Sequence, residues 1–140
     1  MKSLLLSLIL ICNLMAISAE DAAWLLNAQT DLNKAFTQAK KEKTPMIVLL
    51  VVKDGCSWCE KMVNETMQDN TIKNALADAV IVVTDFHSEA AKTYETVLTP
   101  TVYFIDAKTG KSIGTQVGYE KAGNFLITVI SAFDTVDQDR

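Results

Sequence analysis

The sequence predicts an α/β fold, a three-layer α/β/α sandwich in which helices cover both faces of a mixed central sheet. Seven consecutive apolar residues at 46–52 are typical of a strand buried on both faces. Apolar strands alternate with segments of helical spacing along the chain, which is typical of βαβ units. Two later strands, at 101–106 and 111–119, are joined by a short turn, so the sheet should gain an antiparallel hairpin.

Residues 1–19 are expected to be a secretory signal peptide rather than part of the fold. Lys2 provides a basic start, Leu4–Ile17 is an apolar run, and Ala19 is a small residue at the expected cut. As a helix the run would reach about 21 Å, short of the roughly 30 Å of a hydrocarbon core. The sequence therefore predicts cleavage after Ala19, with residues 20–140 as one mature domain. An uncleaved membrane anchor is the alternative.

The first half of the mature domain should contain a short strand, a helix and the buried strand. We expect the short strand at 24–28. A helix should follow, because apolar residues recur at i, i+3, i+4 and i+7, namely Leu32, Ala35, Phe36 and Ala39. The dipeptide Thr44-Pro45 should end the helix, and strand 46–52 follows it.

The second half should alternate helices and strands in the same way. A helix is expected from Cys59 to Met67, with Asn70 capping a further helical stretch up to Ala79. The remaining elements are, in order, strand 80–84, helix 88–95, the hairpin, a helix with its apolar stripe at 125–133, and a fraying polar tail at 134–140.

Composition limits the classes of function that the chain can have. It is 49% hydrophobic with a formal net charge of -4, which argues against intrinsic disorder. Its sequence pI of about 4.9 gives no electrostatic footprint for nucleic acid, so we expect no nucleic-acid partner. The mature length suits a single domain that buries a core without cross-links.

Cys56 and Cys59 carry the strongest chemical signal. The two cysteines have C-x-x-C spacing and lie where a buried strand ends and a helix begins. Cys56 should therefore lie near the unpaired backbone N–H groups of the helix N-terminus, which stabilise an anion. The thiolate is the reactive form of cysteine. Cys59, one turn later, can reach back to the Cys56 sulfur. The pattern predicts thiol–disulfide exchange, with Cys56 as nucleophile and Cys59 as resolving cysteine.

Other interpretations of the cysteine pair stay open. A zinc site needs further ligands, and the sequence offers a single histidine, His87, beside carboxylates. A metal carrier could use the pair with a methionine, and a binding module could use the same surface with little redox turnover. We expect no resident metal and no cofactor.

The sequence resembles the thioredoxin superfamily from about Asp31 to Phe133. The resemblance rests on strand 46–52, on Cys56-Ser57-Trp58-Cys59 opening a helix, on Thr99-Pro100-Thr101 before a strand, and on Gly118 before the last helix. It implies a thioredoxin-like fold, a redox-active Cys56–Cys59 disulfide and a cis peptide bond before Pro100. It also implies a substrate groove formed by Trp58, Thr99 and Pro100 around Cys56.

The segment from Cys56 to Met62 looks most like exported thioredoxin-like oxidoreductases of bacteria. That resemblance implies a periplasmic, monomeric enzyme that acts on protein thiols or disulfides, as a reductase or an oxidase. As a reductase it would need an electron donor, for which a membrane partner is the candidate.

The sequence departs from thioredoxin at two positions. Thioredoxin has a tryptophan directly before its first cysteine, where Gly55 stands here, whereas Trp58 lies inside the pair. Thioredoxin also has a buried aspartate six residues before that cysteine, which helps to deprotonate the second one; Leu50 stands there. Lys53, Asp54 and Glu60 are the nearby ionisable candidates.

Overall fold

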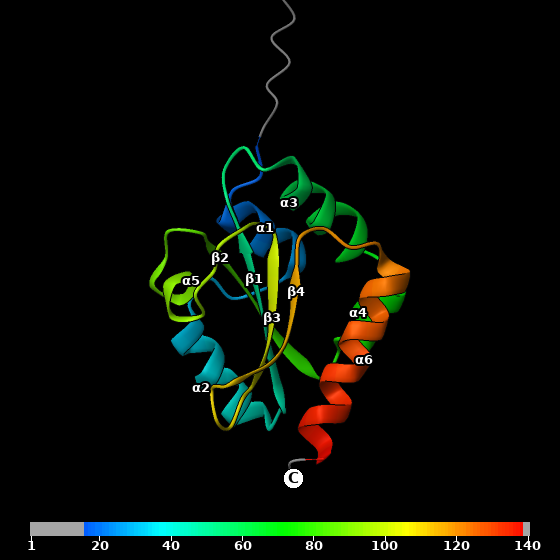
Figure 1. Cartoon of the computed structure of the whole chain (residues 1–140). Coiled ribbons are helices and arrows are strands. Elements are labelled where there is room, and N and C mark those ends of the chain that lie inside the picture. The colour runs from blue at the N-terminus through cyan, green and yellow to red at the C-terminus, as the bar shows by residue number, and fades with distance from the viewer. Residues whose placement is uncertain (1–15, 139–140) are drawn as a thin grey trace, which may run out of the picture.

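The computed structural model describes residues 16–138 (Figure 1). Most of the predicted signal peptide, residues 1–15, therefore lies outside the described residues. Within the described part of the chain, no helix combines the length and the apolar character needed to span a membrane.

A mixed sheet of four strands forms the middle layer, in the order β2-β1-β3-β4. Strand β1 (Met46–Val52) pairs in parallel with β2 (Ala79–Asp85) and antiparallel with β3 (Thr101–Asp106), and β3 pairs antiparallel with β4 (Ser112–Val117). Every residue of β1 is fully buried, because this central strand has neighbours on both edges and side chains packed on both faces. The predicted fold class is confirmed.

Helices cover the two faces of the sheet as separate layers. On one face, α2 (Leu32–Glu42) and α5 (Glu89–Thr93) pack over Ile47, Leu49 and Val51. The other face carries Val48, Leu50 and Val52 of the same strand, because successive strand side chains point to opposite sides. The helices there include α1 (Ala19–Leu26), α4 (Asn70–Ala75) and α6 (Ala122–Gln138). Figure 1 shows α2 and α5 on one side of the strands, with α4 and α6 on the other.

Two predicted elements are wrong. The strand expected at 24–28 is the end of helix α1, whose small residues Ala22 and Ala23 pack into the core while Trp24 is 81% exposed. Gln29 instead reaches the sheet, as an isolated parallel bridge to Val82. The tail does not fray from residue 134, because α6 continues to Gln138 and buries Val136.

Aspartate side chains begin two of the helices. Asp31 caps α2 by accepting hydrogen bonds from the backbone N–H groups of Asn33 and Lys34, at 2.8 and 3.1 Å. Asp69, rather than the predicted Asn70, caps α4. These bonds satisfy N–H groups that have no partner within the helix.

Replacing the α2 cap, Asp31→Ala, is expected to lower the free energy of unfolding by about 1 kcal/mol. Asp31→Asn should cost much less, because asparagine caps helices about as well as aspartate. Urea denaturation monitored by circular dichroism measures both changes. Equal losses in the two variants would show that the carboxylate acts through its charge and not as a hydrogen-bond acceptor.

Candidate redox site

The cysteine pair follows the carboxyl end of β1, where the chain turns sharply into α3 (Ser57–Lys61). Gly55 makes this turn at φ +73°, a left-handed conformation that glycine adopts without steric cost. Cys56 is then the N-cap residue of α3. A π-helical segment, η1 (Met62–Thr66), continues α3, and such segments are frequent at functional sites.

Cys56 and Cys59 form a disulfide in this structure, as the sequence predicts. Their environments differ, since Cys56 is half-buried whereas Cys59 is fully buried in the core cluster that also contains Leu50. The backbone N–H of Cys59 donates to Cys56 Sγ at 3.1 Å. Cys56 is therefore the cysteine of the pair that has exposed surface, while Cys59 is shielded.

A second segment, the connection between α5 and β3, contacts the same sulfur. The Thr99 hydroxyl donates to Cys56 Sγ at 3.5 Å, and the Thr99 carbonyl oxygen lies 3.7 Å from that sulfur. The Thr99–Pro100 peptide bond is cis. Pro100 itself is buried, and its carbonyl accepts a hydrogen bond from the N–H of Gly118 at 2.8 Å. Residues distant in sequence thus converge on Cys56.

Trp58 is 55% exposed, although it has two close partners. Its ring stacks on that of Tyr119, with the centroids 5.4 Å apart and an interplanar angle of 26°. The ammonium group of Lys61 lies 5.5 Å from both ring centroids. The Tyr119 hydroxyl donates to Glu65 Oε2 at 2.9 Å, and Lys61 Nζ lies 3.9 Å from Glu65 Oε1. The indole is therefore held in place beside the disulfide.

The hydrogen bond to Glu65 is the main reason that the pKa of Tyr119 lies above its usual value. A further hydrogen bond joins η1 to the loop between β4 and α6, because the Thr66 hydroxyl donates to the backbone carbonyl of Glu120. Sequence reasoning did not identify Tyr119, Lys61 or Glu65. Lys61 and Glu65 are four residues apart, a spacing that places them on one helical face and can be recognised in the sequence. No local sequence pattern connects Tyr119 to Trp58.

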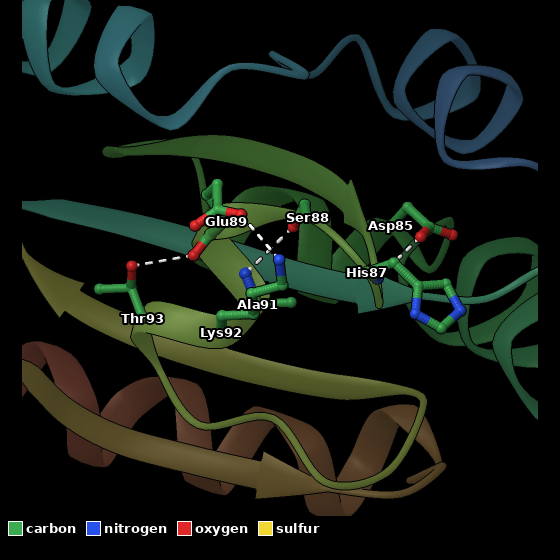
Figure 2. Close-up of polar contacts among 7 residues, drawn as sticks. All are labelled: Asp85, His87, Ser88, Glu89, Ala91, Lys92 and Thr93. Carbon is green, nitrogen blue, oxygen red and sulfur yellow. Dashed lines mark hydrogen bonds and ion pairs between the residues drawn. The ribbon is translucent and has the colours of Figure 1, made fainter.

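Other sequence candidates have partners of their own. The backbone carbonyl of Lys53 accepts a hydrogen bond from the Cys56 N–H at 3.2 Å, while the Lys53 ammonium group lies 5.7 Å from the ring centroid of Phe86. His87 is exposed, and its backbone N–H donates to Asp85 Oδ1 at 2.8 Å (Figure 2). Figure 2 shows its imidazole directed away from the polar contacts of α5, which Ser88 caps. Among residues 16–138, no group of three His, Cys, Asp or Glu side chains is placed to hold a metal ion.

Comparison with known proteins bears on this site. The sequence model of the thioredoxin-like domain matches residues 32–131.

The chain belongs to the thioredoxin-like domain family.

Solved structures share this thioredoxin-like fold. The structure described as DsbH oxidoreductase is 23% identical with a TM-score of 0.64, over 76% of this chain and 85% of that one. A thioredoxin from Thermus thermophilus is 19% identical with a TM-score of 0.66, over 76% and 86%. The oxidised C-terminal domain of DsbD from Neisseria meningitidis is 19% identical with a TM-score of 0.59, over 81% and 99%. No match was found among curated protein sequences.

Proposed function

We propose that this thioredoxin-like protein is an exported thiol–disulfide oxidoreductase, with Cys56 as nucleophile and Cys59 as resolving cysteine. One observation carries the proposal: within a single disulfide, Cys56 is half-buried whereas Cys59 is fully buried. This asymmetry makes Cys56 the sulfur that meets a client. Family membership and the fold shared with DsbH and thioredoxin support the same conclusion.

In the reducing direction, the Cys56 thiolate attacks one sulfur of a client disulfide. A bond forms between Cys56 Sγ and that sulfur, the client disulfide breaks, and the other client sulfur leaves as a thiolate. Cys59 then attacks Cys56 Sγ, which releases the second client thiolate and forms the Cys56–Cys59 disulfide. The client gains two electrons and the protein loses two. The oxidising direction is the reverse, with a client dithiol as reductant.

Two donors are in place to stabilise the Cys56 thiolate once the pair is reduced. The Cys59 N–H and the Thr99 hydroxyl both point at Cys56 Sγ, at 3.1 and 3.5 Å. Hydrogen bonds to the charged form of a group favour that form, so they lower the pKa of a thiol. Thr99 and Pro100, with Trp58, form the proposed client surface around this sulfur.

Location and partners belong to the same proposal. Residues 1–19 would direct export to the periplasm, where disulfides persist, and a membrane protein is the candidate electron donor. In the structure Ser18 caps α1, and Ile17 and Ala19 are buried. Cleavage after Ala19 would remove that cap and the buried Ile17 side chain. The intact mass of the exported protein distinguishes this cut from one before Ile17 and from an uncleaved anchor.

The enzymatic proposal is tested by equilibrating the purified protein with mixtures of reduced and oxidised glutathione. The Cys56–Cys59 pair should pass between disulfide and dithiol in a two-electron transition, read from the mass added by a thiol-alkylating reagent. The midpoint gives the redox potential and so favours reductase or oxidase. Insulin reduction and oxidation of a reduced client then measure turnover. A pair that neither titrates with glutathione nor accelerates either reaction would leave a binding module instead of an enzyme.

A further inference from the structure

Residues 118–120, in the loop between β4 and α6, contact both of the segments that form the redox site. At the start of the loop, the backbone N–H of Gly118 donates to the carbonyl of Pro100 at 2.8 Å. Two residues later, the backbone carbonyl of Glu120 accepts the hydrogen bond of the Thr66 hydroxyl, which belongs to η1. This loop therefore joins the segment before β3 to the helical segment that contains Cys59.

Tyr119 lies between these two backbone contacts, and its side chain reaches Trp58. The two rings stack with their centroids 5.4 Å apart and an interplanar angle of 26°. The Tyr119 hydroxyl donates to Glu65 Oε2 at 2.9 Å, and the ammonium group of Lys61 lies 5.5 Å from both centroids. The Tyr119 ring is thus held at its hydroxyl by η1 and at its backbone by the hydrogen bonds of its two neighbours.

The stacking restricts a side chain that would otherwise be free to change rotamer. Trp58 lies in the first turn of α3 and is 55% exposed, so solvent alone would not fix its indole. A side chain that becomes ordered only when a partner binds reduces the affinity, whereas one that is already ordered does not. Because Tyr119 orders the indole in advance, it can raise client affinity without touching the client.

We propose that Tyr119 is a positioning residue for client binding, which holds the Trp58 indole in a fixed place relative to Pro100. The two residues then form one preorganised surface for the polypeptide that reacts with Cys56. The inference rests on the proposed function, because it concerns how the oxidoreductase binds its client. Among residues 16–138, no hydrogen bond links the Tyr119 side chain to either cysteine, so electron transfer itself should not depend on it.

The variant Tyr119→Leu tests the proposal by removing the aromatic ring. The substrate is a synthetic peptide with one intramolecular disulfide, and its single-turnover reduction by the reduced protein is followed at increasing peptide concentration. The concentration at half-maximal rate should rise about two- to tenfold, the range expected when one side chain must be ordered on binding. The maximal rate should stay at the wild-type value. So should the rate at which dithiothreitol, which has no peptide groups, reduces the Cys56–Cys59 disulfide.

Two further variants separate positioning from a general loss of packing. Tyr119→Phe keeps the stacked ring and loses only the hydrogen bond to Glu65, so it should recover most of the wild-type affinity. Tyr94→Leu is the matched control, because the Tyr94 ring is also 5.4 Å from a neighbouring ring, that of Tyr103, and its hydroxyl donates to the Gly110 carbonyl at 2.9 Å. Those contacts belong to the core cluster on the other face of the sheet. This control should keep the wild-type affinity.

Fluorescence anisotropy reports directly on the order of the indole. The chain has two tryptophans, and Trp24→Phe leaves Trp58 as the remaining one; Trp24 is 81% exposed on α1 and takes no part in the site. In this background, the anisotropy of Trp58 in the reduced protein should fall in Tyr119→Leu. It should stay unchanged in Tyr119→Phe and in Tyr94→Leu.

Different results overturn different statements. A wild-type concentration at half-maximal rate in Tyr119→Leu would overturn the positioning role, as would an equal rise in Tyr94→Leu. A fall of similar size in the reaction with dithiothreitol would also overturn it, because Tyr119 would then act on the cysteine pair and not on the client. If the wild-type protein neither reduces the peptide nor exchanges with glutathione, the proposed function itself is wrong.

Discussion

Cys56→Ser is expected to abolish thiol–disulfide exchange, whereas Cys59→Ser is expected to retain the first attack and to trap the client. The physical reason is the unequal burial of the two cysteines, since Cys56 is half-buried and Cys59 is fully buried. Without Cys56 no accessible nucleophile remains, so the rate should fall to that of the uncatalysed reaction. Without Cys59 the mixed disulfide forms and has no internal thiolate to resolve it.

The measurement is the fraction of protein joined covalently to a disulfide client after a fixed time. Non-reducing electrophoresis and intact mass both report it. All variants carry Cys12→Ser, so that the pair supplies the only thiols, and Ser57→Ala is the control that alters the motif but keeps both cysteines. Trapping by Cys56→Ser in place of Cys59→Ser would reverse the assignment of nucleophile and resolving cysteine.

The central strand and the cysteine pair could be predicted from sequence because their signals are local. Seven apolar residues bounded by Pro45 and Lys53 admit few structures other than a buried strand, and β1 spans the predicted 46–52. The C-x-x-C spacing likewise fixes a short-range geometry. The strand predicted at 24–28 is wrong because the decisive interaction is tertiary. Ala22 and Ala23 bury a helix face that is too narrow to appear as an apolar pattern.

The surroundings of the cysteines were only partly predictable for the same reason. Thr99 and Pro100 entered the prediction through family resemblance, and the structure places Thr99 against Cys56 Sγ. Family resemblance did not indicate Tyr119, since its contact with Trp58 depends on how the loop between β4 and α6 lies against α3. That loop is positioned by the turn at Gly118, at φ +82°, and by the bond between Thr66 and Glu120. Neither the contact of Tyr119 with Trp58 nor the hydrogen bond between Thr66 and Glu120 can be recognised from the local spacing of residues.

The apolar environment of Cys59 leads to the second prediction, which concerns the rate at which the mixed disulfide is resolved. A thiol in apolar surroundings ionises poorly, and Cys59 must lose its proton before it attacks the mixed disulfide. Among the described residues Asp106 is the one buried carboxylate, and it pairs with Met46, at the end of β1 remote from Cys56. Leu50, which lies in the same core cluster as Cys59, stands where thioredoxin has its buried aspartate.

Leu50→Asp is therefore expected to speed resolution of the mixed disulfide at neutral pH by at least about tenfold, because general-base assistance contributes about 10²–10⁴-fold. The same change should lower the free energy of unfolding by several kcal/mol, as an unpaired charge is buried. Burial raises the pKa of a carboxyl above its unfolded value of about 3.9, so the folded variant retains a proton that the unfolded chain releases. Its stability relative to the wild-type protein should then fall as the pH rises from about 4, and should level off above the folded pKa.

Leu50→Asn separates the two consequences, since asparagine matches the shape of aspartate without accepting the thiol proton. It should lose stability by an amount that does not vary with pH, and it should resolve the mixed disulfide no faster than the wild-type protein. Stopped-flow release of the second client thiol gives the resolution rate, and urea denaturation between about pH 4 and 8 gives the stability. If folded Leu50→Asp resolves the intermediate at the Leu50→Asn rate, proton removal from Cys59 does not limit this step, and the leucine reflects core packing alone.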